Sequence, residues 1–317
     1  MEKEKINLIV EKEIGLRMDL FMSMNINSLS RSEVKTAINN GDVQVNGVVE
    51  YRPHYKVRKG DAVTLLRSPQ INNSDSGIKP VKMDLDVIYE DKDLIIINKP
   101  AGLVTHPATG HTEDTLMNGL LYRFYEMSNV GDKIRSGLIH RLDKDTSGLI
   151  LVGKTNLGLW HYSKMFAEKQ IQKTYIVVVK GDIRPKFKDK SEITIRSIHG
   201  RNKLNRKKFA SQKNYDGKMA VTRFKLISFK EIDGQGYSAL FAFPETGRTH
   251  QIRVHLSEAG FPVLGDQIYG KNEYSRLMLH AYKIQLTMLN GKTATFKANL
   301  PKEFKKFTDE HTLEIQN

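Results

Sequence analysis

The chain has 317 residues, enough for two domains, and its formal net charge of +14 at pH 7 favours a polyanionic partner such as a nucleic acid. It contains no cysteine, which excludes disulfides, a thiol nucleophile and any zinc site with cysteine ligands, and which is compatible with a reducing compartment. We find no segment with the features of an export signal and no long apolar run, so we expect a cytoplasmic protein that does not enter a membrane.

Residues 1–66 are predicted to form a small basic domain. Ser30 and Glu33 have the spacing of a capping box, which begins a helix that Gly41 would end. The pair Asn46–Gly47 is a strong hairpin signal and joins two short strands.

Five cations of this small domain are candidates for contacts with the phosphates of a nucleic acid. Two of them lie four residues apart on the predicted helix and therefore share one face. Exposed cations need no partner, so an ordinary solvated surface is an equally good interpretation for any single one. The candidates are Arg17, Arg31, Lys35, Lys56 and Arg58.

A second domain is predicted over residues 83–317, after a polar linker at residues 67–82 that carries Ser, Asn, Pro and Gly. Strand patterns outnumber helix patterns and hairpin-length connections occur, so we expect an α+β domain and not a doubly wound parallel sheet. The predicted strands cover residues 86–89, 94–98, 148–152, 174–179, 193–198, 220–229, 238–243, 283–288 and 293–298. The predicted helices cover residues 112–125, 156–168 and 249–259.

The run HRLDKDTSGLILVGK, from His140 to Lys154, places carboxylates among basic residues just ahead of a strand of branched side chains. Small residues lead into that strand, so we expect Asp143 to lie in a turn at the edge of a sheet. Catalytic groups are often carried on such loops. Composition alone does not distinguish Asp143 from Asp145, because the two would point the same way in an extended turn.

Several motifs resemble those of RNA pseudouridine synthases of the RluA/RluD type, and they occur in the same order. The motifs are NKPAGLVTHP, HRLDKDTSGLILVGK, KTYIVVVKG, ETGRTHQIRVHLSEAGFPVLGDQIYG and LHAYKIQL. The resemblance covers most of residues 81–310, and residues 1–66 resemble the S4-like RNA-binding domain at the front of many such enzymes. It implies an α+β fold in which a mixed, mainly antiparallel curved sheet with helices surrounds a central cleft for RNA.

The resemblance implies an enzyme that isomerises uridine to pseudouridine, by breaking the bond from N1 to C1′ and joining C5 to C1′. It selects Asp143 as the essential carboxylate, acting as nucleophile on C1′ or as base on the sugar, and leaves Asp145 to stabilise the turn. It places Tyr175 over the uracil ring, where the phenol could also take the C5 proton. Arg253, at the rim of the buried stripe of its helix, would pair with Asp143 and keep it ionised.

Further residues of the motifs are expected to contact RNA. Arg141 would fill the place that the flipped uridine leaves. His140 and His106 would line or orient the cleft, although each could equally be a core histidine. The basic run at residues 199–208 would form a loop over RNA, with a solvated hairpin as the alternative.

We expect a monomer that needs neither a metal nor an organic cofactor. His250 and His255 are five residues apart on a helix and diverge, and no motif for a nucleotide cofactor is present. The expected substrate is large-subunit ribosomal RNA, with transfer RNA as an alternative. A catalytically inert RNA-binding protein is the other alternative, because the charge and the front domain require binding alone.

Overall fold

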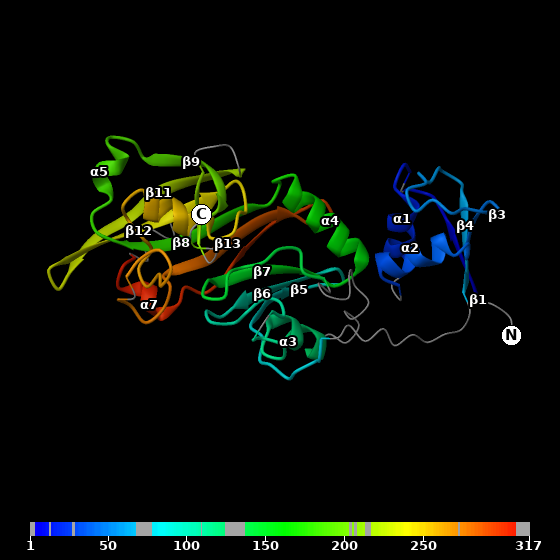
Figure 1. The fold of residues 1–317 in the computed structure, drawn as a ribbon, viewed down its shortest axis with the longest axis horizontal. Helices are drawn as coiled ribbons and strands as arrows, with labels where there is room; N and C mark the ends of the chain where they lie inside the picture. The colour runs from blue at the N-terminus through cyan, green and yellow to red at the C-terminus, as the bar shows by residue number, and fades with distance from the viewer. Residues whose placement is uncertain are drawn as a thin grey trace.

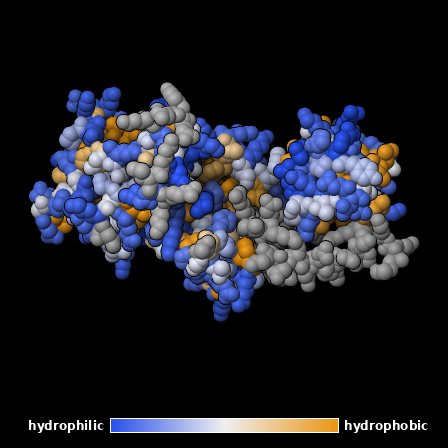
Figure 2. All heavy atoms as spheres, in the orientation of Figure 1, coloured by the Kyte–Doolittle hydropathy of each residue, from blue (hydrophilic) through white to orange (hydrophobic). Residues whose placement is uncertain are grey.

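The computed structural model of the chain describes residues 4–12, 14–26, 29–67, 78–108, 110–123, 137–202, 205, 208–212, 217–271 and 273–308. These residues form a four-stranded and a ten-stranded sheet with separate hydrophobic cores, which confirms the predicted α+β class. In Figure 1 the small sheet and its helices stand beside the larger body, and in Figure 2 hydrophilic residues cover most of the visible face. Within the described residues, no helix is long and apolar enough to span a membrane.

The small sheet is antiparallel throughout and has the order β1-β4-β2-β3. Its domain contains β1 (Glu4–Ile9), α1 (Met18–Asn25), α2 (Arg31–Asn39), β2 (Val43–Val45), β3 (Val48–Val49) and β4 (Ala62–Arg67). The capping box is confirmed, since Ser30 Oγ accepts from the Glu33 amide at 3.3 Å and the Ser30 amide donates to Glu33 Oε2 at 2.8 Å. Strand β1 was not predicted. It is an edge strand with charged residues, and of its described side chains only Ile6 and Leu8 pack against the core, so its apolar pattern is short.

The large sheet has the order β10-β9-β11-β12-β8-β13-β7-β6-β5, with β14 paired to β13. Its strands are β5 (Val87–Glu90), β6 (Leu94–Lys99), β7 (Ser147–Gly153), β8 (Gln172–Lys180), β9 (Glu192–Arg201), β10 (Phe209–Ser211), β11 (Lys218–Ile232), β12 (Gln235–Pro244), β13 (Leu279–Thr287) and β14 (Thr293–Lys297). Its helices are α3 (Leu116–Arg123), α4 (Asn156–Ala167), α5 (Arg184–Phe187), α6 (Gln251–Glu258) and α7 (Lys302–Lys305). Each predicted strand of this domain overlaps an observed one.

Two helices begin later than predicted, for local reasons. Residues before α3 pair with a neighbouring loop through bridges from Val104 to Thr115 and from Ala108 to His111, so the helix begins at Leu116. Helix α6 begins at Gln251 because the residue before it has a left-handed backbone.

Strand β7, into which the turn of Asp143 leads, lies inside the sheet between β6 and β13. Its pairing with β13 is parallel and short, joining Ser147 to His280 and Gly148 to Ala281. Gly148 has a φ of 112°, and a Cβ there would lie 2.3 Å from the Ala281 carbonyl oxygen. Only glycine fits this crossing, which fixes where the loop before β7 meets the sheet.

The two domains meet at α4. Asn156 Nδ2, at the first residue of α4, donates to the Leu29 carbonyl at 3.3 Å, and α1 packs near the same helix. Where the described chain resumes at residue 78, Ile78 is buried in the larger domain. The Lys79 carbonyl accepts a hydrogen bond from Asn118 Nδ2 at 2.7 Å. The residues at 78–82 therefore pack on the large domain.

Candidate active site

A cavity of about 300 Å³ opens where the loop before β7, the start of β8 and the segment leading into α6 meet. Its lining includes Asp143, Tyr175 and Arg253, which come from three distant parts of the sequence. Arg141 and His140 also line the cavity, whereas His106 does not. The structure thus brings the three predicted catalytic residues together.

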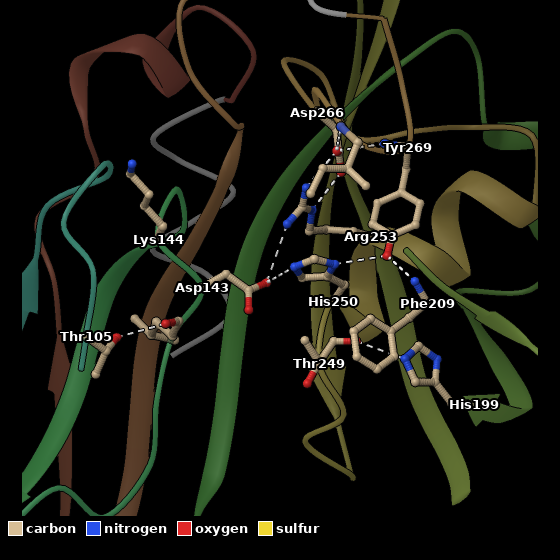
Figure 3. Close-up of polar contacts among 12 residues, drawn as sticks. Thr105, Asp143, Lys144, His199, Phe209, Thr249, His250, Arg253, Asp266 and Tyr269 are labelled. Carbon is tan, nitrogen blue, oxygen red and sulfur yellow. Dashed lines mark hydrogen bonds and ion pairs between the residues drawn. The ribbon is translucent and has the colours of Figure 1, made fainter. Parts of the chain in front are cut away.

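The loop that carries Asp143 is held from behind by two polar side chains. Thr105 Oγ1 donates to the Leu142 carbonyl at 2.8 Å (Figure 3). Lys99 Nζ donates to the Lys144 carbonyl at 3.0 Å. The carbonyls of the residues before and after Asp143 are therefore anchored, while the Asp143 side chain lines the cavity.

Arg253 is buried, only 3% exposed, and not at the rim of its helix as predicted. Its Nε and Nη2 donate to the two carboxylate oxygens of buried Asp266 at 2.7 and 2.8 Å. Asp266 Oδ1 also accepts the amides of Ile268 and Tyr269, which fixes the pair in place. The remaining Nη1 lies 3.6 Å from Asp143 Oδ2, so a rigid guanidinium faces the carboxylate (Figure 3).

A second nitrogen faces the same carboxylate oxygen. His250 Nε2 lies 3.8 Å from Asp143 Oδ2, and its Nδ1 is 2.9 Å from the Tyr269 hydroxyl (Figure 3). That hydroxyl accepts the Phe209 amide at 2.8 Å. His250 has a φ of 58°, so its ring is aimed by a left-handed backbone at the start of α6. Burial lowers the pKa of His250, and the charge of Asp143 opposes that fall.

The basic run at residues 199–208 was predicted to be a loop over RNA. Its first residues, up to Arg201, belong instead to β9, which pairs with β10 after the run. His199 is buried within β9, and its Nε2 donates to the Thr249 carbonyl at 2.8 Å. Its ring stacks on Phe209 at 5.6 Å between centroids, and Phe209 meets His250 edge-on. The start of this run therefore supports the segment that leads into α6.

Tyr175 and His140 occupy different environments in the cavity. Burial raises the pKa of the Tyr175 phenol, and the charge of Asp143 raises it further, so the phenol keeps its proton. His140 Nε2 accepts the Leu151 amide at 3.0 Å and its ring stacks on Phe166. Burial lowers the pKa of His140 to about 3, so it is a neutral, fixed part of the wall.

Comparison with known proteins agrees with this geometry. The sequence pattern of RNA pseudouridylate synthases matches residues 93–258, and that of the S4 domain matches residues 30–71. Ribosomal large subunit pseudouridine synthase D of Borreliella burgdorferi is 36% identical, over 96% of this chain and 94% of its own length. The chain belongs to the RNA pseudouridylate synthase family.

The synthase has other relatives of the same kind. Ribosomal large subunit pseudouridine synthase D of Zymomonas mobilis is 33% identical over 96% of both chains. The structure of Human RNA Pseudouridylate Synthase Domain Containing 1 superposes with a TM-score of 0.57 at 25% identity, covering 69% of this chain and 84% of the human one. The protein is therefore an RNA pseudouridine synthase, an isomerase, with an S4 domain ahead of its catalytic domain.

The cations predicted to contact phosphates in the S4 domain of the synthase fall into two groups. Arg17 and Arg31 both pair with Asp19, at 3.0 and 3.1 Å, although their own side chains are 45% and 42% exposed. Asp19 is fully buried, and although burial raises its pKa, the two arginines lower it below the usual value. Lys35, Lys56 and Arg58 are exposed.

The histidines of α6 have separate partners. His255 is buried, with Nδ1 3.0 Å from Thr222 Oγ1 and Nε2 3.1 Å from Ser197 Oγ, whereas His250 turns toward Asp143. Among the described residues, no group of three or more His, Asp or Glu side chains is placed to hold a metal ion.

Sequence reasoning missed three residues of the synthase site, namely His250, Asp266 and Tyr269. All three lie in the motif at residues 245–270, so the signal for them was present. Their roles depend on the turn that returns residues 266–269 to the start of α6, and spacing along the chain does not reveal that contact.

Proposed function

We propose that this synthase isomerises uridines of large-subunit ribosomal RNA, with Asp143 as its essential catalytic residue. The observation that carries the proposal is the position of the carboxylate, which lies in the cavity with Arg253 Nη1 at 3.6 Å and His250 Nε2 at 3.8 Å. A carboxylate beside a fixed cation suits attack on the ribose, as nucleophile at C1′ or as base on the sugar. Asp145 is exposed and keeps the role of stabilising the turn.

His250 is assigned to orient Asp143 as a neutral donor. The Tyr269 hydroxyl already accepts the Phe209 amide, so its own proton is available for His250 Nδ1. That hydrogen bond leaves the proton of the imidazole on Nε2, which faces Asp143. The carboxylate then faces one charged and one neutral N–H group, at 3.6 and 3.8 Å.

Tyr175 is assigned to hold the uracil ring while it turns. Stacking on an aromatic ring keeps the detached base in the cavity between cleavage of N1 from C1′ and formation of the bond from C5 to C1′. Taking the C5 proton would require Tyr175 first to lose its own proton, which burial and Asp143 both oppose. The proton that leaves C5 is balanced by the one that N1 gains, so the overall reaction is an isomerisation.

The target uridine must leave its stack to reach Asp143, which is least unfavourable in an RNA loop. Arg141 is exposed at the cavity and is assigned to the place that the base vacates. The proposed domain limits are residues 1–66 for the S4 domain and 83–317 for the catalytic domain, with a linker at 67–82 whose last residues, 78–82, pack on the catalytic domain.

Ribosomal RNA is favoured over transfer RNA by two observations. Two relatives that match almost the whole chain, those of Borreliella burgdorferi and Zymomonas mobilis, are named for the ribosomal large subunit, and the S4 domain adds exposed cations beside the catalytic domain. Chemical mapping of pseudouridines in cells with and without this gene tests the choice. We expect sites in large-subunit ribosomal RNA to disappear and to return with the wild-type gene, whereas loss confined to transfer RNA would contradict the assignment.

A further inference from the structure

A second pocket adjoins the catalytic cavity on the opposite face of the large sheet. It has a volume of about 370 Å³ and shares Lys173 and Pro244 with the cavity. On β8, Tyr175 faces the cavity, whereas Gln172 and Thr174 line this rear pocket, as the alternation of a strand requires. The two sites therefore meet at the end of the sheet where β8 begins and β12 ends.

The rear pocket is cationic. Four cations line it, together with one carboxylate, that of exposed Glu245. The cations come from the turn after α4 and from strands β8, β11 and β13, so the fold gathers them from distant parts of the chain. They are Lys169, Lys173, Arg223 and Lys283.

Two of these lysines lie in environments that disfavour their charge. Burial lowers the pKa of Lys173 to about 8, and the neighbouring charge of Lys169 adds to the fall. Burial also lowers the pKa of Lys283, with a further contribution from Lys297 on the adjacent strand. An anion bound in the pocket would favour the charged forms of the lysines that line it.

The other polar groups of the pocket suit an anion with several oxygens. Arg223 is already fixed, since its Nη1 donates to Glu192 Oε2 at 2.7 Å and its guanidinium lies over the Phe243 ring at 4.5 Å. Lys283 and Thr174 are paired on neighbouring strands, and both line the pocket.

We propose that the rear pocket binds a backbone phosphate of the substrate RNA, on the nucleotide that flanks the flipped uridine. The inference rests on the proposed function in one respect, that the RNA in the catalytic cavity is the substrate. Because Lys173 and Pro244 border both sites, a strand whose base enters the cavity can pass round the end of the sheet and place its neighbouring phosphate here. The subsite would fix the register of the RNA without contacting a base.

The test uses the full-length protein with Lys169→Gln and Lys283→Gln, singly and together. Lys302→Gln is the matched control, because Lys302 is exposed on α7, at the opposite end of the large domain from α4 (Figure 1). Pseudouridine formation on transcribed large-subunit ribosomal RNA is followed in single turnover against enzyme concentration at several salt concentrations. Thermal melting of each variant checks that the fold is retained.

Each pocket variant should raise the half-saturating enzyme concentration by roughly fivefold to tenfold and leave the saturating rate unchanged. The slope of log affinity against log salt should flatten by about 0.7 to 0.9 for each lysine that no longer neutralises a phosphate, with no comparable change in Lys302→Gln. Pocket variants that behave like the control, in an enzyme that is active, would overturn the subsite alone. If wild-type protein bound this RNA but formed no pseudouridine in it, the proposed substrate would be wrong. The binding data would still show whether the pocket contacts a phosphate.

Discussion

At the scale of single residues, the site depends on side chains whose own positions are fixed by others. Lys99 is an example, since its ammonium is fully buried and donates to the carbonyls of Pro100 and Leu103, both at 2.8 Å, as well as to Lys144. It ties the NKPAGL segment to the loop of Asp143. Three carbonyl partners make an ammonium tolerable there, although burial still disfavours its charge.

The pH dependence of stability should report this buried lysine. Burial lowers the pKa of Lys99 to about 7, from 10.5 in the unfolded chain, so between these values the unfolded state binds more protons. The free energy of unfolding should therefore rise with pH across this window, and it should not depend on Lys99 below a pH of about 7, where the lysine is protonated in both states. Denaturant unfolding of wild type and Lys99→Met should differ by a slope of up to about 1.4 kcal/mol per pH unit. Parallel pH profiles would contradict the assignment.

The link from Tyr269 through His250 to Asp143 is tested by removing one hydroxyl. Tyr269→Phe should lower the saturating rate of pseudouridine formation roughly tenfold to a hundredfold, because the imidazole loses the partner that sets its tautomer and aim. RNA affinity should change little, since Tyr269 is not expected to contact phosphate. Tyr122→Phe, at an exposed tyrosine of α3, is the control. If Tyr269→Phe were as fast as wild type, the link from Tyr269 through His250 to Asp143 would have no role in the reaction.

The sequence identified those residues of the site that lie at recognisable positions of a motif. Asp143, Tyr175 and Arg253 were singled out, and the structure does place them in one cavity. The buried pairing of Arg253 with Asp266 was not foreseen, because helix periodicity places a side chain on a face and says nothing about which distant loop covers that face.

At the scale of elements, the short parallel contact between β7 and β13 positions the catalytic loop. Local patterns predicted both strands, because branched residues and bounding turns mark them in the sequence. The pairing of β7 with β13 was not predictable, because it depends on a close approach of Gly148 to the Ala281 backbone, and these two residues are far apart in the sequence.

Gly148→Ala tests the crossing. The added Cβ would lie 2.3 Å from the Ala281 oxygen and the backbone would keep a positive φ, so we expect a loss of roughly 2 kcal/mol or more in the free energy of unfolding, together with loss of activity. Gly234→Ala is the control, because Gly234 has a φ of 72° with no atom within 4 Å of the added Cβ. That variant should lose about 1 to 2 kcal/mol. Equal losses in the two variants would show that the close approach is unimportant.

At the scale of the whole molecule, the S4 domain meets the catalytic domain at α4 and adds cations of two kinds. Arg17 and Arg31 neutralise buried Asp19, so replacing either arginine should lower the stability of the S4 domain more than it lowers RNA affinity. Composition could predict a basic domain but could not separate these ion-paired arginines from the exposed cations, because the partner carboxylate is buried by folding.

Replacing Lys35, Lys56 and Arg58 together by glutamine tests their contact with RNA. If each binds one phosphate, the slope of log affinity against log salt should flatten by about 2 to 3 in total. The saturating rate of pseudouridine formation should be unchanged, because the catalytic cavity is intact. Filter binding to ribosomal RNA across a salt series measures the slope, and an unchanged slope would place the RNA on another surface of the domain.

The central claim is that Asp143 acts on the ribose, and Asp143→Asn tests it most directly, because the amide keeps the shape and removes the charge. Single-turnover conversion of large-subunit ribosomal RNA should fall below detection, with RNA affinity close to wild type. Asp145→Asn, in the same turn but exposed, should remain active. An active Asp143→Asn enzyme, or an inactive Asp145→Asn enzyme beside it, would contradict the account.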